Sequence, residues 1–331
     1  MRRMLLLSRA EVESLLDPDR LIDALAEAMV DLSSGAASMP TRVAATVAEH
    51  DGLLGAMPAW LPSAGTLQTK LVSVYPRNAA RGIATHQALI VAFDPETGSP
   101  VAVMDGTAIT AQRTAAGSAL ATRLLAREAA RTLAVLGTGV QAVSHLRYVP
   151  RVRAFTSILV AGRDSNEARA LAEAASAELD TEVEAAGSFE EAVRSADVVC
   201  ATTHAEEPVL RREWLRDGAH VNSVGWTPSG REIDAETVRD SLVVVESLAS
   251  AFAEGPGGSN DLRWPVRDGV VGPDHVHTEI GQILAGSEPG RTSDRQLTLY
   301  KSVGVAVQDA AAAGLVLRGA RARGVGRDIG L

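Results

Sequence analysis

Apolar residues near the start of the chain recur at the spacing of a helix. Between residues 10 and 32 they form one stripe, which includes Val12, Leu25 and Met29. Apolar positions three and four residues apart predict an amphipathic helix. Pro18 lies within this stretch, and a proline breaks or restarts a helix. We therefore expect helical structure over residues 10–32 with an interruption at Pro18.

Short apolar segments separated by turn residues follow over residues 41–105. Turn residues fill positions 94–98 between two of these segments, which predicts a β-hairpin within a mostly β domain. An alanine-rich stretch at 107–129, with Gly117 as its single glycine, then predicts a long helix that carries the chain into a second domain. The strands of the first domain are expected at 41–47, 67–74, 88–93 and 101–105.

Strand and helix patterns alternate between residues 130 and 250, which is typical of a parallel, doubly wound sheet. Residues 254–274, rich in Gly, Pro and Asp, predict a surface loop. Residues 276–285 and 295–318 have a helical pattern, and we expect the tail after 318 to fray. The strands are expected at 132–136, 157–161, 197–201, 219–224 and 242–246, with a short segment near 181–185, and the helices at 140–149, 165–178, 188–195 and 210–216.

Composition narrows the class of protein. At about 100–200 residues per domain, 331 residues predict two domains. A net charge of −9 argues against nucleic acid as a partner, because its binding needs a concentrated basic surface. No apolar run reaches the roughly 18 residues of a membrane span, and the run that ends at Ser8 is too short for a signal peptide. Cys200, the single cysteine, excludes an intramolecular disulfide, so we expect a cytoplasmic protein without a membrane partner.

Lysine occurs only at Lys70 and Lys301, so 30 of the 32 basic residues are arginine. A general arginine bias explains the surplus of arginine. A lysine in such a sequence can indicate a position where arginine cannot replace it, because burial lowers the pKa of lysine so that it can release a proton, whereas arginine stays protonated. Lys70 is therefore a candidate for chemistry.

The strongest motif runs from Gly137 to Ala142 (Gly-Thr-Gly-Val-Gln-Ala), between a predicted strand and a predicted helix. Gly137 permits a tight turn, Gly139 lets the backbone approach a pyrophosphate at the helix N-terminus, and Ala142 allows close packing. The triplet alone is weak evidence, but its β-α-β context favours a dinucleotide-binding, Rossmann-type domain over a structural glycine turn. The predicted fold class is thus α/β, a doubly wound parallel sheet plus a second, mostly β domain.

Gly162, Arg163 and Asp164 lie where the second strand of that sheet ends. An NAD site has an acidic residue there for the ribose 2′-hydroxyl, and Gly162 occupies about that position. Arg163 can pair with a 2′-phosphate, so NADP(H) is favoured and NAD(H) is possible. In the competing interpretation Asp164 contacts the ribose, or Arg163 is a solvated surface charge, and the cofactor is NAD or either dinucleotide.

Arg42, Lys70 and Arg113 are candidates for binding an anionic substrate. An arginine binds a carboxylate with two parallel hydrogen bonds, and cations near a nicotinamide make a bound imine or keto group more electrophilic. The ordinary role of any single arginine is a solvated surface charge. His86 is an acid–base candidate with a structural role as the alternative. The other histidines show no spacing typical of a metal site, so no metal is expected.

Several short stretches match one known family in the same order along the chain. They are residues 57–59 (Met-Pro-Ala), 70–72 (Lys-Leu-Val), 85–89 (Thr-His-Gln-Ala-Leu), 110–116, 137–142, 290–292 (Gly-Arg-Thr), 301–304 (Lys-Ser-Val-Gly) and Asp309. With them, nearly the whole chain resembles the ornithine cyclodeaminase/mu-crystallin family. The resemblance implies a homodimer with a substrate-binding and dimerisation domain, residues 1–116 with 297–331, and a dinucleotide-binding domain, residues 117–296.

The resemblance also implies roles for single residues. Arg42, Lys70 and Arg113 would hold the substrate carboxylate and the reacting centre, with Lys70 and Arg113 as catalytic residues and Val303 facing the substrate. The contacts expected at the dinucleotide, from the two motifs and the resemblance together, are Thr85, Arg113, Gly137, Thr138, Gly139, Val140, Gln141, Arg163, Asp164, Thr202, the region 221–224 with Val224, and Ser302.

The chain departs twice from ornithine cyclodeaminases. Those enzymes carry a catalytic aspartate in the glycine-rich segment after the fifth strand, whereas residues 224–232 here have no acid before Pro228. They also carry a glutamate just before the Met-Pro pair, where this chain has Gly55 and Ala56. Cyclodeamination needs such an acid–base group. Mu-crystallin-like ketimine reductases and related amino-acid dehydrogenases lack the aspartate too, and they fit better.

We therefore expect an NAD(P)H-dependent oxidoreductase that acts on a carbon–nitrogen bond. Its substrate would be a small cyclic ketimine carboxylate of the pyrroline- or piperideine-2-carboxylate type, reduced to the cyclic amino acid. Lys70 would polarise the reacting group or relay the proton. The alternatives are an ornithine cyclodeaminase with recycled NAD, an open-chain amino-acid dehydrogenase, and a binding protein that keeps the dinucleotide fold without catalysis.

Overall fold

The computed structural model describes residues 3–179 and 181–330, in two compact units. The first unit ends at Arg113 and resumes at Gly304, and the second unit is Thr114–Val303. The boundary at 113 lies inside helix α3 (Gly106–Leu125). The long helix predicted over 107–129 is therefore present, although it ends earlier, and it leads from one unit to the other.

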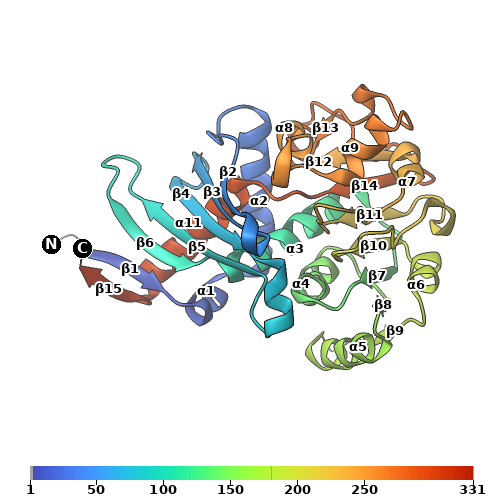
Figure 1. Cartoon of the computed structure of the whole chain (residues 1–331), viewed down its shortest axis with the longest axis horizontal. Coiled ribbons are helices and arrows are strands. Elements are labelled where there is room, and N and C mark those ends of the chain that lie inside the picture. The colour runs from blue at the N-terminus through green and yellow to red at the C-terminus, as the bar shows by residue number, and fades with distance from the viewer. Residues whose placement is uncertain (1–2, 180, 331) are drawn as a thin grey trace. The chain divides into compact units, whose positions relative to one another are not determined.

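A seven-stranded sheet forms the first unit, with its strands in the order β15-β1-β6-β5-β4-β3-β2 (Figure 1). Neighbouring strands pair antiparallel, except for β1 and β6, which run parallel. The mostly β character predicted for residues 41–105 is confirmed. The strands are β1 (Arg3–Leu7), β2 (Val43–Val47), β3 (Gly52–Leu61), β4 (Thr66–Val74), β5 (His86–Phe93), β6 (Pro100–Asp105) and β15 (Arg327–Gly330).

Three of these strands, β1, β3 and β15, were absent from the sequence prediction. Gly55 and Pro58 interrupt the apolar alternation of β3, which nevertheless pairs with β4 along its length and sets Met57 opposite Lys70. The frayed tail predicted after residue 318 is wrong. Helix α11 continues to Arg323, and β15 then pairs antiparallel with β1, so the strand's backbone groups find partners.

Three helices belong to this unit in addition to the start of α3: α1 (Arg9–Leu15), α2 (Pro18–Ser33) and α11 (Ala306–Arg323). The predicted interruption is confirmed, because Pro18 is the first residue of α2 and Asp17 caps it. Helix α11 packs against β3, β4 and α2, and every residue from 306 to 316 is buried. Most of these residues are alanine or glycine, which makes the polar pair Gln308 and Asp309 conspicuous.

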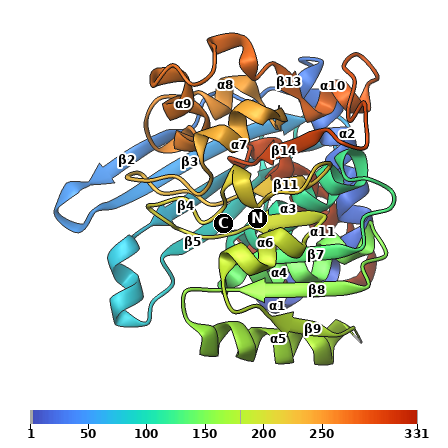
Figure 2. The ribbon, with the colours of Figure 1, turned by 90° about the vertical axis from the view of Figure 1, so that its right-hand side faces the viewer.

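Eight parallel strands form the sheet of the second unit, in the order β13-β12-β14-β11-β10-β7-β8-β9 (labelled in Figure 1 and seen from another side in Figure 2). From β7 the chain adds β8 and β9 on one side and then β10 and β11 on the other, which is the predicted doubly wound topology. Ligands of such sheets bind beyond the carboxyl ends of the strands at this reversal. The strands are β7 (Thr132–Leu136), β8 (Ser157–Ala161), β9 (Val183–Ala185), β10 (Val198–Ala201), β11 (His220–Ser223), β12 (Ser241–Val245), β13 (Thr278–Glu279) and β14 (Leu297–Lys301).

Helices connect these strands, and most lie where the sequence predicted them. A core of small and branched apolar residues from both sheet and helices, among them Ala134, Val199, Ala192 and Val238, is fully buried. The helices are α4 (Val140–Tyr148), α5 (Ser165–Leu179), α6 (Phe189–Ser195), α7 (Ala235–Asp240), α8 (Leu248–Ala251), α9 (Asn260–Arg267) and α10 (Ile280–Leu284).

Three predictions for the second unit are wrong. The helix predicted over 295–318 begins with strand β14 instead, which lies between β11 and β12 with all five residues buried. A strand buried on both faces shows no alternation, so periodicity cannot distinguish it from a buried helix. Residues 297–303 consequently belong to the second unit and not to the predicted substrate domain. The loop predicted over 254–274 contains α9, and the helix predicted at 210–216 is one short turn, Arg212–Trp214.

Candidate functional site

Lys70 lies in the middle of β4 with its side chain in the interior of the first unit. Alternate residues of the strand, Gln68, Lys70 and Val72, are buried, whereas Leu71 between them is exposed on the opposite face. Only 2% of Lys70 is exposed. Lysine is almost never buried to this degree unless an opposite charge pairs with it.

Asp309 of α11 supplies that charge. Its Oδ2 atom lies 2.8 Å from Lys70 Nζ, and its Oδ1 atom accepts a hydrogen bond from Arg113 Nε at 3.1 Å. Lys70 Nζ also donates to Thr110 Oγ1 at 3.4 Å. One fully buried carboxylate therefore joins two cations that come from different elements, β4 and α3.

Gly304 brings Arg42 into the same group. Its carbonyl oxygen accepts a hydrogen bond from Arg42 Nη2 at 2.7 Å. A Cβ at this position would lie 2.7 Å from Arg113 Nη2, and the backbone φ is +71°, so glycine is required by space and by conformation. Arg113 Nη1 donates to Gln308 Oε1 at 3.1 Å. We refer to Arg42, Lys70, Arg113 and Asp309 as the cationic cluster.

The protonation of the cationic cluster follows from its burial. Burial lowers the pKa of Lys70 from its ordinary 10.5 to about 8; Asp309 opposes this shift, while Arg113 and Arg42 add to it. Burial alone would raise the pKa of Asp309, but Lys70 and Arg113 hold it below its ordinary value. Near neutral pH, three positive charges and one negative charge leave the cluster with a net charge of +2.

His86, the acid–base candidate, begins β5 opposite Val74. Burial lowers the pKa of its imidazole to about 4, and the charges of Lys70 and Arg113 add to the shift while Asp309 opposes it. The ring is therefore uncharged at physiological pH. Thr85, the residue before it, is half-buried, and its carbonyl oxygen accepts a hydrogen bond from the backbone of Tyr75 at 2.8 Å.

In the second unit, Gly137 follows β7 in a conformation that other residues rarely adopt. Its φ is +116°, and a Cβ would lie 2.8 Å from Thr202 Oγ1. Thr202 follows β10, and its hydroxyl donates to the carbonyl oxygen of Leu136 at 2.8 Å. The glycine turn therefore lies at the reversal of strand order between β7 and β10, where ligands of this fold bind.

Gly139 is the N-cap of α4. Among the described residues, no side chain caps this helix and no atom lies within 4 Å of the position of a Cβ on Gly139. Val140 is 64% exposed. The first amides of an uncapped helix have no partner within the helix and lie at the positive end of its dipole, so they suit a phosphate. These residues fit the pyrophosphate of a dinucleotide.

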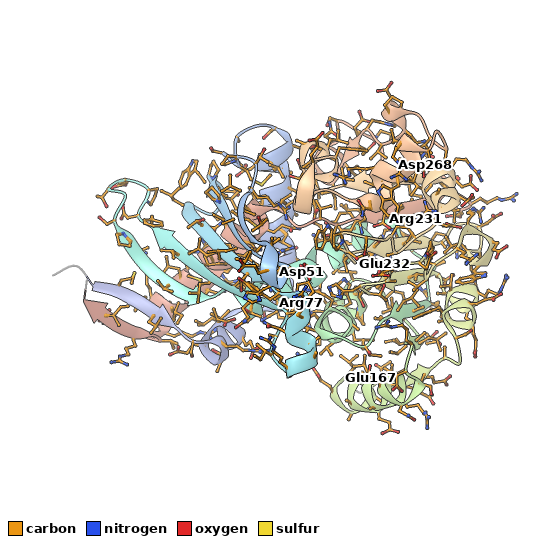
Figure 3. The ribbon with its side chains drawn as sticks, in the orientation of Figure 1. Asp51, Arg77, Glu167, Arg231, Glu232 and Asp268 are labelled. Carbon is orange, nitrogen blue, oxygen red and sulfur yellow. The ribbon has the colours of Figure 1, made fainter. Side chains whose placement is uncertain are left out.

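The rest of the motif is consistent with a ligand. Ala142 is fully buried, as close packing of helix and strand requires. Gln141 Oε1 is buried and has no hydrogen-bond partner within the described part of the chain. A buried polar atom without a partner is costly and therefore rare. Thr138 Oγ1 donates to Glu167 Oε2 at 2.8 Å, and Figure 3 labels this glutamate on α5.

Further predicted residues follow strands of the same sheet. Val224 follows β11, and Ser302 and Val303 follow β14. Because the carboxyl ends of parallel strands share one edge, these residues lie at the edge that carries the glycine turn. Glu246 holds two of them: it accepts hydrogen bonds from Ser302 Oγ and from the backbone N–H of Val303, each at 2.7 Å. Thr85 and Arg113 belong to the first unit.

Arg163 and Asp164 follow β8. Asp164 Oδ1 accepts hydrogen bonds from the backbone N–H groups of Asn166 and Glu167, at 2.7 and 3.4 Å, and thereby caps the start of α5. Arg163 is exposed and borders a cavity of 530 Å³ within the second unit. The wall of this cavity combines apolar and acidic side chains with two arginines: Phe189, Ala205, Pro208, Val209 and Trp214; Glu190, Glu206, Glu207 and Glu213; Arg163 and Arg211.

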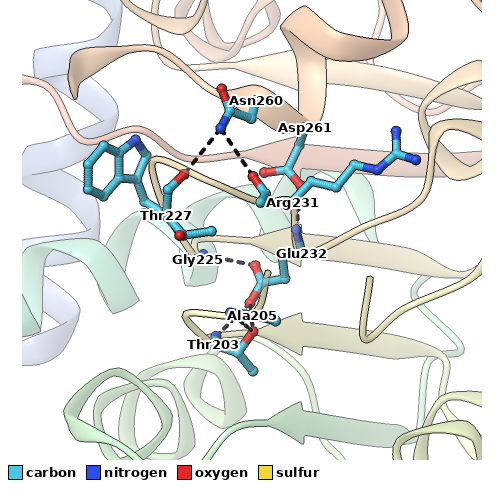
Figure 4. Close-up of a pocket in the computed structure, with 10 residues that line it drawn as sticks. Thr203, Ala205, Gly225, Thr227, Arg231, Glu232, Asn260 and Asp261 are labelled. Carbon is cyan, nitrogen blue, oxygen red and sulfur yellow. Dashed lines mark hydrogen bonds between the residues drawn. The ribbon is translucent and has the colours of Figure 1, made fainter. Parts of the chain in front are cut away.

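The loop after β11, residues 224–230, is held by buried charged residues (Figure 4). Glu232 accepts hydrogen bonds from the backbone N–H of Gly225 at 2.8 Å and from Ser223 Oγ at 2.9 Å. Asp261 Oδ1 accepts one from the backbone N–H of Glu232 at 2.7 Å. Lys301 Nζ lies 2.8 Å from Asp261 Oδ2 and donates to the carbonyl oxygen of Gly225 at 2.7 Å. Lys301, the second lysine of the chain, is therefore part of the hydrogen-bond and ion-pair network that holds the loop at residues 224–230.

Asn260 completes the support of this loop. Its Nδ2 donates to the carbonyl oxygens of Thr227, Pro228 and Gly230, at 3.1–3.2 Å. Burial raises the pKa of the Glu232 carboxyl, and each of its oxygens accepts hydrogen bonds from the protein. Glu232 and Asp261 thus hold the backbone around this loop, and both follow Pro228 in the sequence instead of preceding it.

The described residues were also compared with the requirements of a metal site, a membrane-spanning helix and a reactive cysteine. Within residues 3–179 and 181–330, no group of three or more His, Cys, Asp or Glu side chains is placed to hold a metal ion. In the same part of the chain, no helix has both the length and the apolar character for crossing a bilayer. Burial raises the pKa of the Cys200 thiol to about 12, which agrees with an unreactive core residue.

Sequence reasoning assigned no role to Asp309 in the cationic cluster, and none to Gln308 and Gly304, which hold its arginines. A signal was present for Asp309, which is the acid within the alanine-rich stretch from 306 to 316. An acid in a helix so poor in polar residues is expected to be buried, and a buried carboxylate needs a cation. Nothing in the spacing indicates that the cation is Lys70.

Comparison with known proteins matches nearly the whole chain to one family. A family model described as "Ornithine cyclodeaminase/mu-crystallin family" matches residues 2–323. The ketimine reductase mu-crystallin of Mus musculus is 38% identical over 315 residues, which are 94% of this chain and 95% of that protein. Both comparisons span the first and the second unit.

Two solved structures resemble the chain over nearly its full length or all of it. Delta(1)-pyrroline-2-carboxylate reductase of Thermococcus litoralis, in complex with NADH and L-proline, has a TM-score of 0.94 and 39% identity, and the match covers 98% of this chain and 100% of that chain. An archaeal alanine dehydrogenase dimer with bound NAD has a TM-score of 0.92 and 34% identity, with 100% of both chains covered.

Proposed function

The chain belongs to the ornithine cyclodeaminase/mu-crystallin family, and from this premise we propose that it is an NAD(P)H-dependent oxidoreductase that reduces a small cyclic ketimine carboxylate to the cyclic amino acid. The observation that carries the proposal is the cationic cluster, in which a lysine of lowered pKa lies beside two arginines. Such a group matches a substrate with a carboxylate and a basic nitrogen.

Arg42 and Arg113 bind the substrate carboxylate in this proposal. A guanidinium group binds a carboxylate with two parallel hydrogen bonds. The hydrogen bonds to Gly304 and Gln308 already hold the two side chains, so little freedom is lost when the substrate binds. The net charge of +2 favours an anion, and Val303 is the proposed apolar contact of the substrate.

Lys70 provides the proton. Reduction of an imine places a hydride on carbon and requires a proton on nitrogen. With a pKa of about 8, the Lys70 ammonium is mostly protonated at neutral pH and is a stronger acid than an ordinary lysine. The imine nitrogen takes the proton, which makes the adjacent carbon electrophilic, and the neutral amine of Lys70 regains a proton from solvent before the next turnover.

The glycine turn of the second unit would hold the dinucleotide. Gly137, Thr138, Gly139, Val140 and Gln141 fit its pyrophosphate, because the start of α4 is uncapped and Gln141 Oε1 lacks a protein partner in the described residues. Thr202, Val224 and Ser302 are further proposed contacts at the same edge. Thr85 and Arg113 of the first unit are also proposed to contact the dinucleotide. When bound, the reduced nicotinamide supplies the hydride.

We also propose that NADP(H) is the preferred dinucleotide. Arg163 is exposed beside the cavity at the end of β8 and can pair with a 2′-phosphate, whereas Asp164 is occupied as a helix cap. Arg163→Ala should therefore lower kcat/KM for NADPH about tenfold or more and leave kcat/KM for NADH nearly unchanged. Arg169→Ala, at another exposed arginine nearby, is the matched control. Equal losses with both dinucleotides would contradict this preference.

An ornithine cyclodeaminase is the first alternative. It requires a carboxylate free to act as acid and base near the loop at residues 224–230. Glu232 and Asp261 are engaged with backbone N–H groups and with Lys301, so this alternative is disfavoured. The second alternative, an open-chain amino-acid dehydrogenase, is favoured by the likeness to alanine dehydrogenase.

We propose that the protein is a homodimer that forms through the first unit. Four neighbouring strands carry exposed apolar side chains on one face of the sheet: Val43, Leu54, Leu71 and Leu89. Their exposed fractions, 37–66%, are large for apolar residues that adjoin one another. Contiguous exposed apolar surface of this kind marks a protein interface.

An activity panel tests the proposed function. The purified protein is mixed with NADPH or NADH and either pyrroline-2-carboxylate, piperideine-2-carboxylate, or pyruvate with ammonia, and the loss of the reduced nicotinamide is followed. We expect oxidation with a cyclic ketimine. Oxidation with pyruvate and ammonia alone would favour the dehydrogenase, and ammonia release from ornithine without net oxidation would favour the cyclodeaminase. If no substrate in the panel leads to oxidation of the nicotinamide or to release of ammonia, the proposal is contradicted.

A further inference from the structure

Asp309 has an unusual position for a charged residue. It lies on α11 among alanines, it is fully buried, and its two oxygens contact two different cations, Lys70 and Arg113. A buried ion pair contributes little to stability compared with apolar residues of the same size, so stability alone does not explain it. The two cations are also those expected to contact the substrate.

The carboxylate controls the direction of both side chains. Arg113 is fixed by Asp309 Oδ1 at one nitrogen and by Gln308 Oε1 at another, so two consecutive residues of α11 orient one guanidinium. Lys70 reaches across from β4 to Asp309 Oδ2 at 2.8 Å. Without the carboxylate, Lys70 would lose this ion pair and would still face two guanidinium groups.

We propose that Asp309 is a positioning residue, which orients Arg113 for the substrate carboxylate and keeps Lys70 protonated as the proton donor. This inference rests on the proposed function. Asp309 does not itself donate a proton to the substrate, because Lys70 and Arg113 hold it ionised. It is a counter-charge that makes a buried lysine usable as an acid at neutral pH.

The groups around Lys70 determine what a change at Asp309 does. Asp309 on α11 is the anion, Arg113 and Thr110 lie on α3, Arg42 precedes β2, and the uncharged ring of His86 lies on β5. The influences of burial and of the two arginines all oppose the charge on Lys70. Asp309→Asn therefore removes the group that sustains this charge, and the lysine should lose its proton at lower pH.

The direct test uses the fact that the chain has two lysines. Protein labelled with ¹⁵N at the lysine side chain gives two Nζ signals, which Lys70→Arg assigns. In the intact protein the Lys70 signal should titrate near pH 8. In Asp309→Asn it should titrate about one pH unit lower or more. Asp23→Asn removes an exposed carboxylate of the same unit and should leave the Lys70 signal unmoved.

Kinetics supply the second readout. The alkaline limb of kcat/KM for ketimine reduction should move to lower pH in Asp309→Asn by the same amount as the Lys70 titration, and kcat at neutral pH should fall about tenfold or more. Asp309→Glu keeps the charge and should restore most of the activity. An unchanged Lys70 titration and an unchanged alkaline limb in Asp309→Asn would overturn the proposal and leave Asp309 a structural residue.

Two further outcomes are informative. If Asp309→Asn is not recovered folded, Asp309→Glu is compared with the intact protein instead. A shift of both the Lys70 titration and the alkaline limb of kcat/KM supports the proposal. A shifted alkaline limb without a change in the Lys70 titration overturns it. If the intact protein reduces no ketimine, the proposed function fails. The Lys70 titration in Asp309→Asn still decides whether Asp309 sustains its charge.

Discussion

At the scale of single residues, the chemistry of the chain depends on one buried amine. Lys70 is nearly inaccessible to solvent, and its pKa of about 8 is the result of burial, which lowers it, and of Asp309, which raises it. Arginine does not release a proton in a protein. In a chain with 30 arginines, a lysine at this position is consequently the cation that can act as an acid.

The pH dependence of ketimine reduction follows from this pKa. Lys70 loses its proton as the pH rises through about 8, so kcat/KM should be level below that value and should fall about tenfold per pH unit above it. Lys70→Arg remains protonated and should remove the alkaline limb, at a cost of about 100-fold or more in kcat. An alkaline limb that persists in Lys70→Arg would assign the titration to another group.

Gly304 offers a test of the position of Arg113. In Gly304→Ala the new methyl group would lie 2.7 Å from Arg113 Nη2, so the guanidinium must move, and KM for the ketimine should rise about tenfold or more. Gly35→Ala is the matched control, because its φ of +77° is similar to the +71° of Gly304 but no atom of the described residues lies within 4 Å of its Cβ. If the KM for the ketimine rises equally in Gly304→Ala and Gly35→Ala, backbone strain and not the displacement of Arg113 is the cause.

At the scale of elements, the sequence predicts local chemistry well and long-range pairing poorly. The glycine turn was predictable because each of its requirements is met by a residue within six positions of Gly137. Strands β1 and β15 were not predictable, since they pair with each other across more than 300 residues and the other partner of β1, strand β6, is also distant in the sequence. Strand β14 was missed because it is buried on both faces and lacks alternation.

The two glycines of the turn should behave differently. Gly139→Ala adds a Cβ where the structure has open space and a φ of −83°, so stability should change by less than about 1 kcal/mol while the Kd of NADPH rises about tenfold or more. Gly137→Ala combines a φ of +116° with a contact 2.8 Å from Thr202 Oγ1 and should lower stability by about 2 kcal/mol or more.

Calorimetric unfolding and binding titrations distinguish these effects. Unchanged binding of NADPH by a stably folded Gly139→Ala would contradict the place assigned to the pyrophosphate. A Gly137→Ala variant as stable as the intact protein would show that the turn relaxes, and would contradict the argument from its conformation.

At the scale of the whole molecule, the sequence predicted two domains with boundaries after residues 116 and 296, and the structure divides into two units after Arg113 and after Val303. The cationic cluster draws on residues from 42 to 309, which are joined only by folding. Its arginines and lysine were candidates from the sequence, and the resemblance to a family gave them roles. Asp309 was among the residues that match the family, but it received no role, because no spacing rule links an acid on the last helix to a lysine on a strand.

The exposed apolar face of the first unit leads to a prediction about assembly. Leu89→Glu places a charge among Leu71 and the other apolar residues of this face, so the protein should shift from dimer to monomer in light scattering. Ile83→Glu is the control, because Ile83 is similarly exposed but lies outside the sheet. A dimer that survives Leu89→Glu would exclude this face as the interface.

One isotope experiment tests the central claim most directly. The protein is incubated with pyrroline-2-carboxylate and a reduced nicotinamide dinucleotide that carries deuterium at C4 in both positions, and the product is examined by mass spectrometry and NMR. We predict proline with one deuterium at the α-carbon, formed one-to-one with oxidised dinucleotide. Proline without deuterium would contradict the account. So would the absence of proline from this substrate together with the absence of a cyclic amino acid from its six-membered homologue.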